Sequence, residues 1–232
     1  PAELINTPAA QLTRIYANDG KTLLTTFYDQ DRHDVPLARI APVMQQAIVA
    51  AEDTRFYQHD GVDLKGVARA LVTNTREGSV QQGASTLTMQ LVRNALKENT
   101  ALTPAERAAA TEETAARKLR EIQYAVALEK RLSKQQILQN YLNIVYFGDG
   151  AYGIEAASRR IFGVIPARLS LAQAALIAGI VQNPEGDNPI GGDRDRARTR
   201  QLYVLEAMVK AQMITSQQRA AAAAEKLTFA GR

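Results

Sequence analysis

The chain has no cysteine among its 232 residues and only two histidines, His33 and His59. The missing thiols exclude disulfide bonds, thiolate metal sites and cysteine nucleophiles. Two histidines are too few for a multi-histidine zinc site, and a serine–histidine triad would have to use one of them. These absences remove several common kinds of metalloenzyme and hydrolase.

A long hydrophobic run is also missing. The longest apolar stretch, residues 174–181, is far short of the roughly 20 residues that cross a bilayer. The first residues, Pro1-Ala2-Glu3, have neither the basic region nor the apolar core of a signal peptide. Because the chain starts without methionine, we expect it to be a piece of a longer protein.

The composition is that of a folded globular protein, with 46% hydrophobic and 22% charged residues. The length suits one sizeable domain or two lobes that share a cleft. A net charge of +4 and a pI near 9.4 favour an anionic partner, such as phosphate, nucleic acid or an anionic membrane surface. The charge does not choose among these partners.

The hydrophobic pattern predicts a mainly α protein with one small β element. Two β-prone runs flank Asn18-Asp19-Gly20, which predicts a hairpin within residues 14–28. A short helix on a mobile connector is expected over 98–113, and an alanine-rich tail follows residue 215. Apolar residues at helical spacing predict helices over 41–53, 63–75, 86–96, 113–132, 133–143, 154–162, 170–181 and 194–213.

Two serines mark where helices should begin, since Ser133 and Ser170 each precede an apolar stripe and can cap it. The helix after Ser170 is almost entirely apolar and should be buried. In the helix over 113–132, the side chains expected to face inward are those of Leu119, Ile122, Val126 and Leu132.

The segment Glu52-Asp53-Thr54-Arg55-Phe56-Tyr57-Gln58-His59-Asp60-Gly61 places acids at a helix end beside aromatic residues. Partial burial there would raise the pKa of a carboxyl toward that of a general base. Taken alone, the segment is more commonly explained by solvated acids at a helix end.

A second segment, 83–90, places three hydroxyl groups and an amide at the start of a helix. These groups can cap the helix, or the helix N-terminus can bind an anion together with Arg93 and Asn94. The segment does not match a Walker phosphate loop. Farther on, Arg117 and Glu121 lie four residues apart on one helical face, either as a surface ion pair or as part of a basic patch that binds diphosphate.

Four motifs in order resemble glycosyltransferase family 51, which polymerises lipid II into peptidoglycan strands in class A penicillin-binding proteins and monofunctional transglycosylases. The resemblance covers residues 40–189. E-D-x-x-F-x-x-H-x-G begins at Glu52, G-x-S-T-x-T-x-Q at Gly83, R-K-x-x-E at Arg117, and K-x-x-I-L-x-x-Y-L-N at Lys134. Departures from the family pattern occur at Met89, Arg93 and Val164, where glutamine, lysine and lysine are usual.

The resemblance implies an inverting transfer from an undecaprenyl-diphosphate-linked glycan to lipid II, forming a β-1,4 linkage. Glu52 would be the general base, and Glu121 would orient the donor end or the basic residues. Asp53 would be a tentative ligand of a divalent cation, Mg²⁺ or Mn²⁺. The implied substrate-binding residues are Asp53, Phe56, His59, Ser85, Thr86, Gln90, Arg93, Asn94, Arg117, Lys118 and Asn143.

The same resemblance implies a lysozyme-like, two-lobed helical domain over 36–215, after an N-terminal linker and hairpin over 1–35. Residues 216–232 would form a tail that leads to a further domain, such as a transpeptidase. The expected partners are lipid II, the growing glycan and, through the lipid, the outer face of the bacterial cell membrane, with no nucleic acid. The competing hypotheses are a lysozyme-like glycan hydrolase and a non-catalytic basic binding module.

Overall fold

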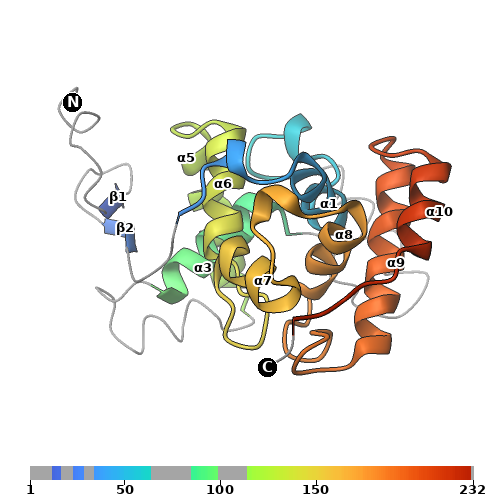
Figure 1. Ribbon diagram of the computed structural model, residues 1–232. Helices are drawn as coiled ribbons and strands as arrows, with labels where there is room; N and C mark the ends of the chain where they lie inside the picture. Colours follow the sequence, from blue (N-terminus) through green and yellow to red (C-terminus); the bar gives the residue numbers. More distant parts are fainter. Residues whose placement is uncertain (1–11, 17–22, 29–33, 64–84, 99–113, 231–232) are drawn as a thin grey trace.

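The computed structural model describes residues 12–16, 23–28, 34–63, 85–98 and 114–230. Figure 1 shows a mainly helical molecule, which confirms the predicted class. The helix predicted over 63–75 and the connector predicted over 98–113 lie outside the described residues, apart from their ends. Within the described part, no helix is long and apolar enough to cross a membrane.

The elements follow the predicted order, with boundaries shifted by a few residues. The last predicted helix ends three residues early, and a further helix forms in the alanine-rich tail, where Thr215 and Gln218 make a capping box. The helices are α1 Pro42–Glu52, α3 Leu87–Glu98, α5 Ala115–Glu129, α6 Lys134–Ile144, α7 Gly153–Phe162, α8 Leu171–Ile180, α9 Arg194–Lys210 and α10 Ser216–Ala224. Short 3-10 turns occupy Leu37–Arg39, Phe56–Gln58 and Pro166–Arg168.

Strands β1 (Leu12–Tyr16) and β2 (Leu23–Tyr28) pair in antiparallel fashion, with Leu12 opposite Tyr28. The turn predicted at residues 18–20 lies outside the described residues. The complete hairpin therefore stays a prediction, as do the domain boundaries and the division into two lobes.

Helix α8 lies in the middle of the molecule, with α9 and α10 to one side and α3, α5 and α6 to the other (Figure 1). Ser170 opens it, as predicted, and forms a capping box with Gln173; eight of its ten residues are buried. At Gly179 a Cβ atom would lie 2.9 Å from Cβ of Arg200. The glycine therefore lets α9 approach α8 closely, and the apolar centre built this way supports the end of α1.

The inward face predicted for α5 was wrong at Leu119, whose side chain is 61% exposed. The buried face instead runs through Glu121, Ala125 and Leu128, at helical spacing. A hydrophobic pattern counts glutamate as a surface residue, whereas here a buried ion cluster holds Glu121. Ile122, Val126 and Leu132 are half-buried, as expected for positions beside that face.

Candidate functional site

Glu52 is the last residue of α1. The helix starts at Pro42, buries an apolar face, and ends where Asp53 leaves the helical region at φ −160° and ψ 73°. Oε2 of Glu52 accepts a hydrogen bond of 2.8 Å from Nε2 of Gln90 on α3. Oε1 is buried and has no hydrogen-bond partner among the described residues. One oxygen of the carboxylate is thus held, and the other is left to receive a proton.

Four influences set the pKa of Glu52. Burial, the largest, raises it above the ordinary glutamate value, because the charged form loses hydration. The hydrogen bond from Gln90 and the positive charge of Arg200 lower it, whereas the negative charge of Asp53 raises it. The net result is a raised pKa, the direction expected for a general base.

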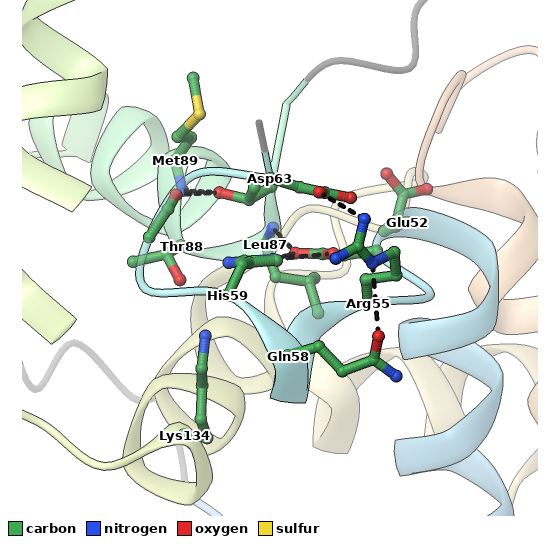
Figure 2. A network of polar contacts seen from close by, with 12 residues as sticks. Glu52, Arg55, Gln58, His59, Asp63, Leu87, Thr88, Met89 and Lys134 are labelled. Carbon is green, nitrogen blue, oxygen red and sulfur yellow. Dashed lines mark hydrogen bonds and ion pairs between the residues drawn. The ribbon is translucent and has the colours of Figure 1, made fainter. Parts of the chain in front are cut away.

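Asp53 ties the loop after α1 to the start of α3. Its carboxylate lies 2.9 Å from Nε2 of His59 and accepts a 3.0 Å hydrogen bond from the backbone N–H of Leu87. Figure 2 shows this network, with His59 and Leu87 joined through it and Glu52 beside it. Both Asp53 oxygens lie within hydrogen-bond distance of His59 Nε2. The contacts of Asp53 and His59 thus position the two helices that flank Glu52.

Asp53 does not fit the tentative role of a metal ligand, because its oxygens already serve His59 and α3. The described residues also contain no cluster of three histidine, aspartate or glutamate side chains that could hold a metal ion. The contacts of Asp53 among the described residues therefore serve the fold.

The hydroxyl groups at the start of α3 separate into different roles. Thr86 donates 2.7 Å to the carbonyl of Gly61 and accepts from the backbone N–H of Met89, so it caps the helix. Thr88 donates to Glu129. Ser85 accepts a hydrogen bond from Nζ of Lys118 and is half-buried. Of these three, Ser85 is the one placed beside the basic residues, whereas the contacts of Thr86 are structural.

A cluster of three basic side chains surrounds the carboxylate of Glu121, which is 1% exposed. Arg93 grips it in bidentate fashion, at 2.7 Å from Nε and 3.1 Å from Nη2. Arg117 donates to the same carboxylate, and Nζ of Lys118 lies 3.9 Å from it. We call these four residues the basic cradle. Among the described residues, the cradle gathers three cationic groups around one carboxylate, and such groups bind anions through charge-assisted hydrogen bonds.

The pKa of Lys118 lies below the ordinary lysine value, chiefly because burial disfavours the charged form. Burial lowers it from the ordinary lysine value, Glu121 raises it, and the neighbouring Arg93 and Arg117 lower it. An arriving anion would relieve the repulsion among the three cations. The i, i+4 pair of Arg117 and Glu121 is therefore part of a buried cluster, and a simple surface ion pair is the wrong description.

Three other predicted site residues, Asn143, Phe56 and Asn94, make different kinds of contact. Asn143 donates 3.0 Å to the carbonyl of Val35 and accepts 3.0 Å from its N–H, so its amide clamps the segment before α1. Phe56 is fully buried, with Nζ of Lys134 4.5 Å from its ring centroid. Asn94 is half-buried on α3, one turn after Gln90. Phe56 and Asn143 thus serve the fold.

Sequence reasoning missed two residues near Glu52. Tyr141, taken as part of an apolar stripe, donates 3.0 Å from its hydroxyl to Oε1 of Gln90. A buried tyrosine usually has a hydrogen-bond partner, which was the available signal. Arg200, on α9, donates 3.2 Å to the carbonyl of Gly179 and acts electrostatically on Glu52. Nothing in the local sequence of α9 signals that role.

The motif segments therefore converge on one part of the fold. Helix α3 carries both Gln90, which holds the carboxylate of Glu52, and Arg93, which belongs to the basic cradle. Residues three apart lie on the same side of a helix. The half-buried carboxylate of Glu52 and the basic cradle are thus joined by contacts from less than two turns of one helix.

Comparison with known proteins gives a family match over most of the chain. The transglycosylase family model matches residues 19–209. Penicillin-binding protein 2D of Bacillus subtilis (strain 168) is 41% identical over 205 residues, which are 88% of this chain and 28% of that protein. Penicillin-binding protein 1A of Neisseria lactamica is 40% identical over 222 residues, or 96% of this chain and 26% of that protein.

A 2.6 Å crystal structure of penicillin-binding protein 1A from Haemophilus influenzae aligns with 97% of this chain and 22% of its own. The TM-score is 0.49 and the sequence identity is 21%. The chain spans about a quarter of the length of the relatives named above.

Proposed function

Since this chain belongs to the transglycosylase family, we propose that it is a peptidoglycan glycosyltransferase that polymerises lipid II into β-1,4-linked glycan strands. The observation that carries the proposal is the pairing of Glu52 with the basic cradle through Gln90 and Arg93 of α3. A base and a site for an anionic leaving group are both needed when a hydroxyl displaces a diphosphate.

Glu52 acts as the general base through Oε1, the oxygen without a partner among the described residues. It takes the proton from the 4-hydroxyl of the lipid II acceptor as that oxygen attacks the anomeric carbon of the donor. The new C–O bond forms as the bond to the lipid diphosphate breaks, and the bonding electrons leave with the diphosphate. A single displacement inverts the anomeric centre.

The basic cradle stabilises the charge that gathers on the departing diphosphate. Arg93 and Arg117 offer guanidinium groups, and Lys118 offers an ammonium group beside the Ser85 hydroxyl. Charged donors fixed before the reaction stabilise such a transition state without having to reorganise. Glu121 holds the cations together, which makes it an organising residue within this mechanism. A divalent cation bound with the diphosphate would add further positive charge.

We place this reaction at the outer face of the bacterial cell membrane, because the donor and acceptor both carry lipid chains. The growing glycan and lipid II are the proposed partners, and nucleic acid is not among them. In the parent protein, a transpeptidase domain would follow this chain and cross-link the strands.

Incubation of the chain with purified lipid II tests the proposal. Wild type should form glycan polymer, and Glu52→Gln should lower the rate by about 10²–10⁴-fold, the usual contribution of a general base. Glu206→Gln, an exposed glutamate on α9, is the matched control and should behave as wild type. Cleavage of preformed glycan without polymer would indicate a hydrolase, and equal polymerisation by Glu52→Gln would overturn the assignment of the base.

A further inference from the structure

Tyr141 has a hydroxyl group buried deep in the helical core. The residue lies on α6 and is fully buried. Its hydroxyl donates a hydrogen bond of 3.0 Å to Oε1 of Gln90, whose Nε2 donates 2.8 Å to Oε2 of Glu52. The three side chains form one chain of hydrogen bonds that ends on the proposed base.

The direction of this chain depends on the charge of Glu52. An ionised carboxylate only accepts hydrogen bonds, so Gln90 must turn its NH₂ group toward it. The carbonyl of Gln90 then faces the opposite way, where it needs a donor, and the Tyr141 hydroxyl supplies one. A flipped amide would point its carbonyl at the carboxylate and would suit only a protonated Glu52.

We infer that Tyr141 is a positioning residue for Glu52, because its hydroxyl fixes the amide of Gln90 in the orientation that donates to the ionised base. The inference deepens the proposed function and rests on it. When Glu52 takes a proton on Oε1, Oε2 still accepts the hydrogen bond from Gln90, but the contact weakens because the carboxylate has lost its charge.

Few other charged groups act on the carboxylate of Glu52 among the described residues, so a change in its contact with Gln90 should be measurable. Arg200 of α9 contributes a positive charge and the neighbouring Asp53 a negative one. Helix α8, which packs against α1, carries no ionisable side chain. Burial and the negative charge of Glu52 raise the pKa of the Tyr141 phenol well above its ordinary value, so the phenol keeps its proton and remains a donor.

The effect of Gln90 on the pKa of Glu52 decides whether loss of the Tyr141 hydroxyl should raise or lower that pKa. This hydrogen bond lowers the pKa of Glu52. Weakening it should raise that pKa, so that less of the base is ionised at a given pH. The acid limb of the kcat profile should therefore move to higher pH, with little change in KM for lipid II.

A double-mutant cycle tests the inference, with Tyr141→Phe, Gln90→Leu and the combination of the two. The carboxyl of Glu52 is titrated by NMR in ¹³C-glutamate-labelled chain without substrate, and its signal is assigned by its loss in Glu52→Gln. Each single variant should raise the Glu52 pKa by about one unit, the scale of a hydrogen bond to a charged group. The double variant should show no further rise. Tyr124→Phe, which removes a hydroxyl on α5, is the matched control and should change nothing.

An unchanged Glu52 pKa in Tyr141→Phe, or effects that simply add in the double variant, would overturn the inference. If Tyr141→Phe does not fold, a titration of the wild-type chain still tests the inference. The ¹³Cζ signal of Tyr141 should then titrate with the midpoint of Glu52, and a flat signal would contradict the relay. Polymerisation assays are kept separate, because cleavage of glycan without polymer formation would overturn the proposed function and leave the titration result standing.

Discussion

Gln90 donates a hydrogen bond of 2.8 Å to Oε2 of Glu52, and this contact joins α3 to the end of α1. It links two segments that lie 38 residues apart in the sequence. The geometry explains how a glutamate with a raised pKa keeps a fixed position, and it leads to the following predictions.

The partly buried carboxylate of Glu52 should lower the stability of the fold. A carboxyl whose pKa is raised on folding is destabilising once it ionises, so the cost appears as the pH rises above the ordinary glutamate value. Glu52→Gln, which carries no charge, should therefore have a higher Tm than wild type at pH 7.5 and about the same Tm at pH 4. Thermal melts at both pH values test this, and a lower Tm for Glu52→Gln at pH 7.5 would contradict it.

Arg200 should help to keep Glu52 ionised. Its positive charge lowers the pKa of Glu52, so Arg200→Met should raise that pKa and move the acid limb of polymerisation upward by about half a pH unit. Lys210→Met removes the same charge from an exposed site on the same helix and serves as the control. A pH–rate profile in which both variants shift alike would show that only the overall charge matters.

Asp53 should be important for stability. Asp53→Ala leaves His59 and the first N–H group of α3 without their partner, and the free energy of unfolding should fall by about 2–3 kcal/mol. Asp60→Ala, at an exposed position in the same loop, should stay within about 0.5 kcal/mol of wild type. Urea unfolding provides both values, and equal losses would refute the anchoring role.

A bound anion should replace part of the stabilising negative charge of Glu121. Glu121→Gln removes the carboxylate that separates three cations, and we expect Tm to fall by about 4–8 °C, the equivalent of about 2 kcal/mol. Inorganic diphosphate should restore part of that loss by binding in the basic cradle. Glu155→Gln on α7 removes the half-buried i, i+4 partner of the exposed Arg159, and its Tm should neither fall nor respond to diphosphate. No recovery in Glu121→Gln would argue against diphosphate binding there.

The two leucines of α5 should differ in their contribution to stability. Leu128 is 5% exposed, so Leu128→Ala should cost about 2–5 kcal/mol through lost burial and the resulting cavity. Leu119→Ala should stay within about 0.5 kcal/mol. Denaturant unfolding of both variants compares them directly, and a similar cost at Leu119 would restore the inward face predicted from the sequence.

Local signals in the sequence were enough to place most of the helices. Ser133 and Ser170 start helices through capping boxes, as predicted, because a cap depends only on residues within one turn. The face of α5 was not predictable in this way. Its orientation depends on the buried contact of Glu121 with Arg93, a residue on another helix.

The sequence indicated which residues belong to the candidate site better than it indicated what each of them does there. Glu52 and the basic residues come together as the motifs indicated, but Thr86 and Asn143 are occupied by backbone groups of Gly61 and Val35. Arg200 and Tyr141 act on the site from distant helices. Such roles arise from tertiary packing, so a single sequence contains little information about them.

Helix α3 sets the spacing between the proposed general base and the proposed site of the leaving group. Gln90 and Arg93 are three positions apart, so the contact to the proposed base and the contact to the proposed leaving group are spaced by a rise of about 4.5 Å along the helix axis. Inserting one residue between them would turn one contact away from the other by about 100°. A residue inserted in a loop elsewhere would leave this spacing unchanged, whereas one inserted between these two positions would separate the two contacts.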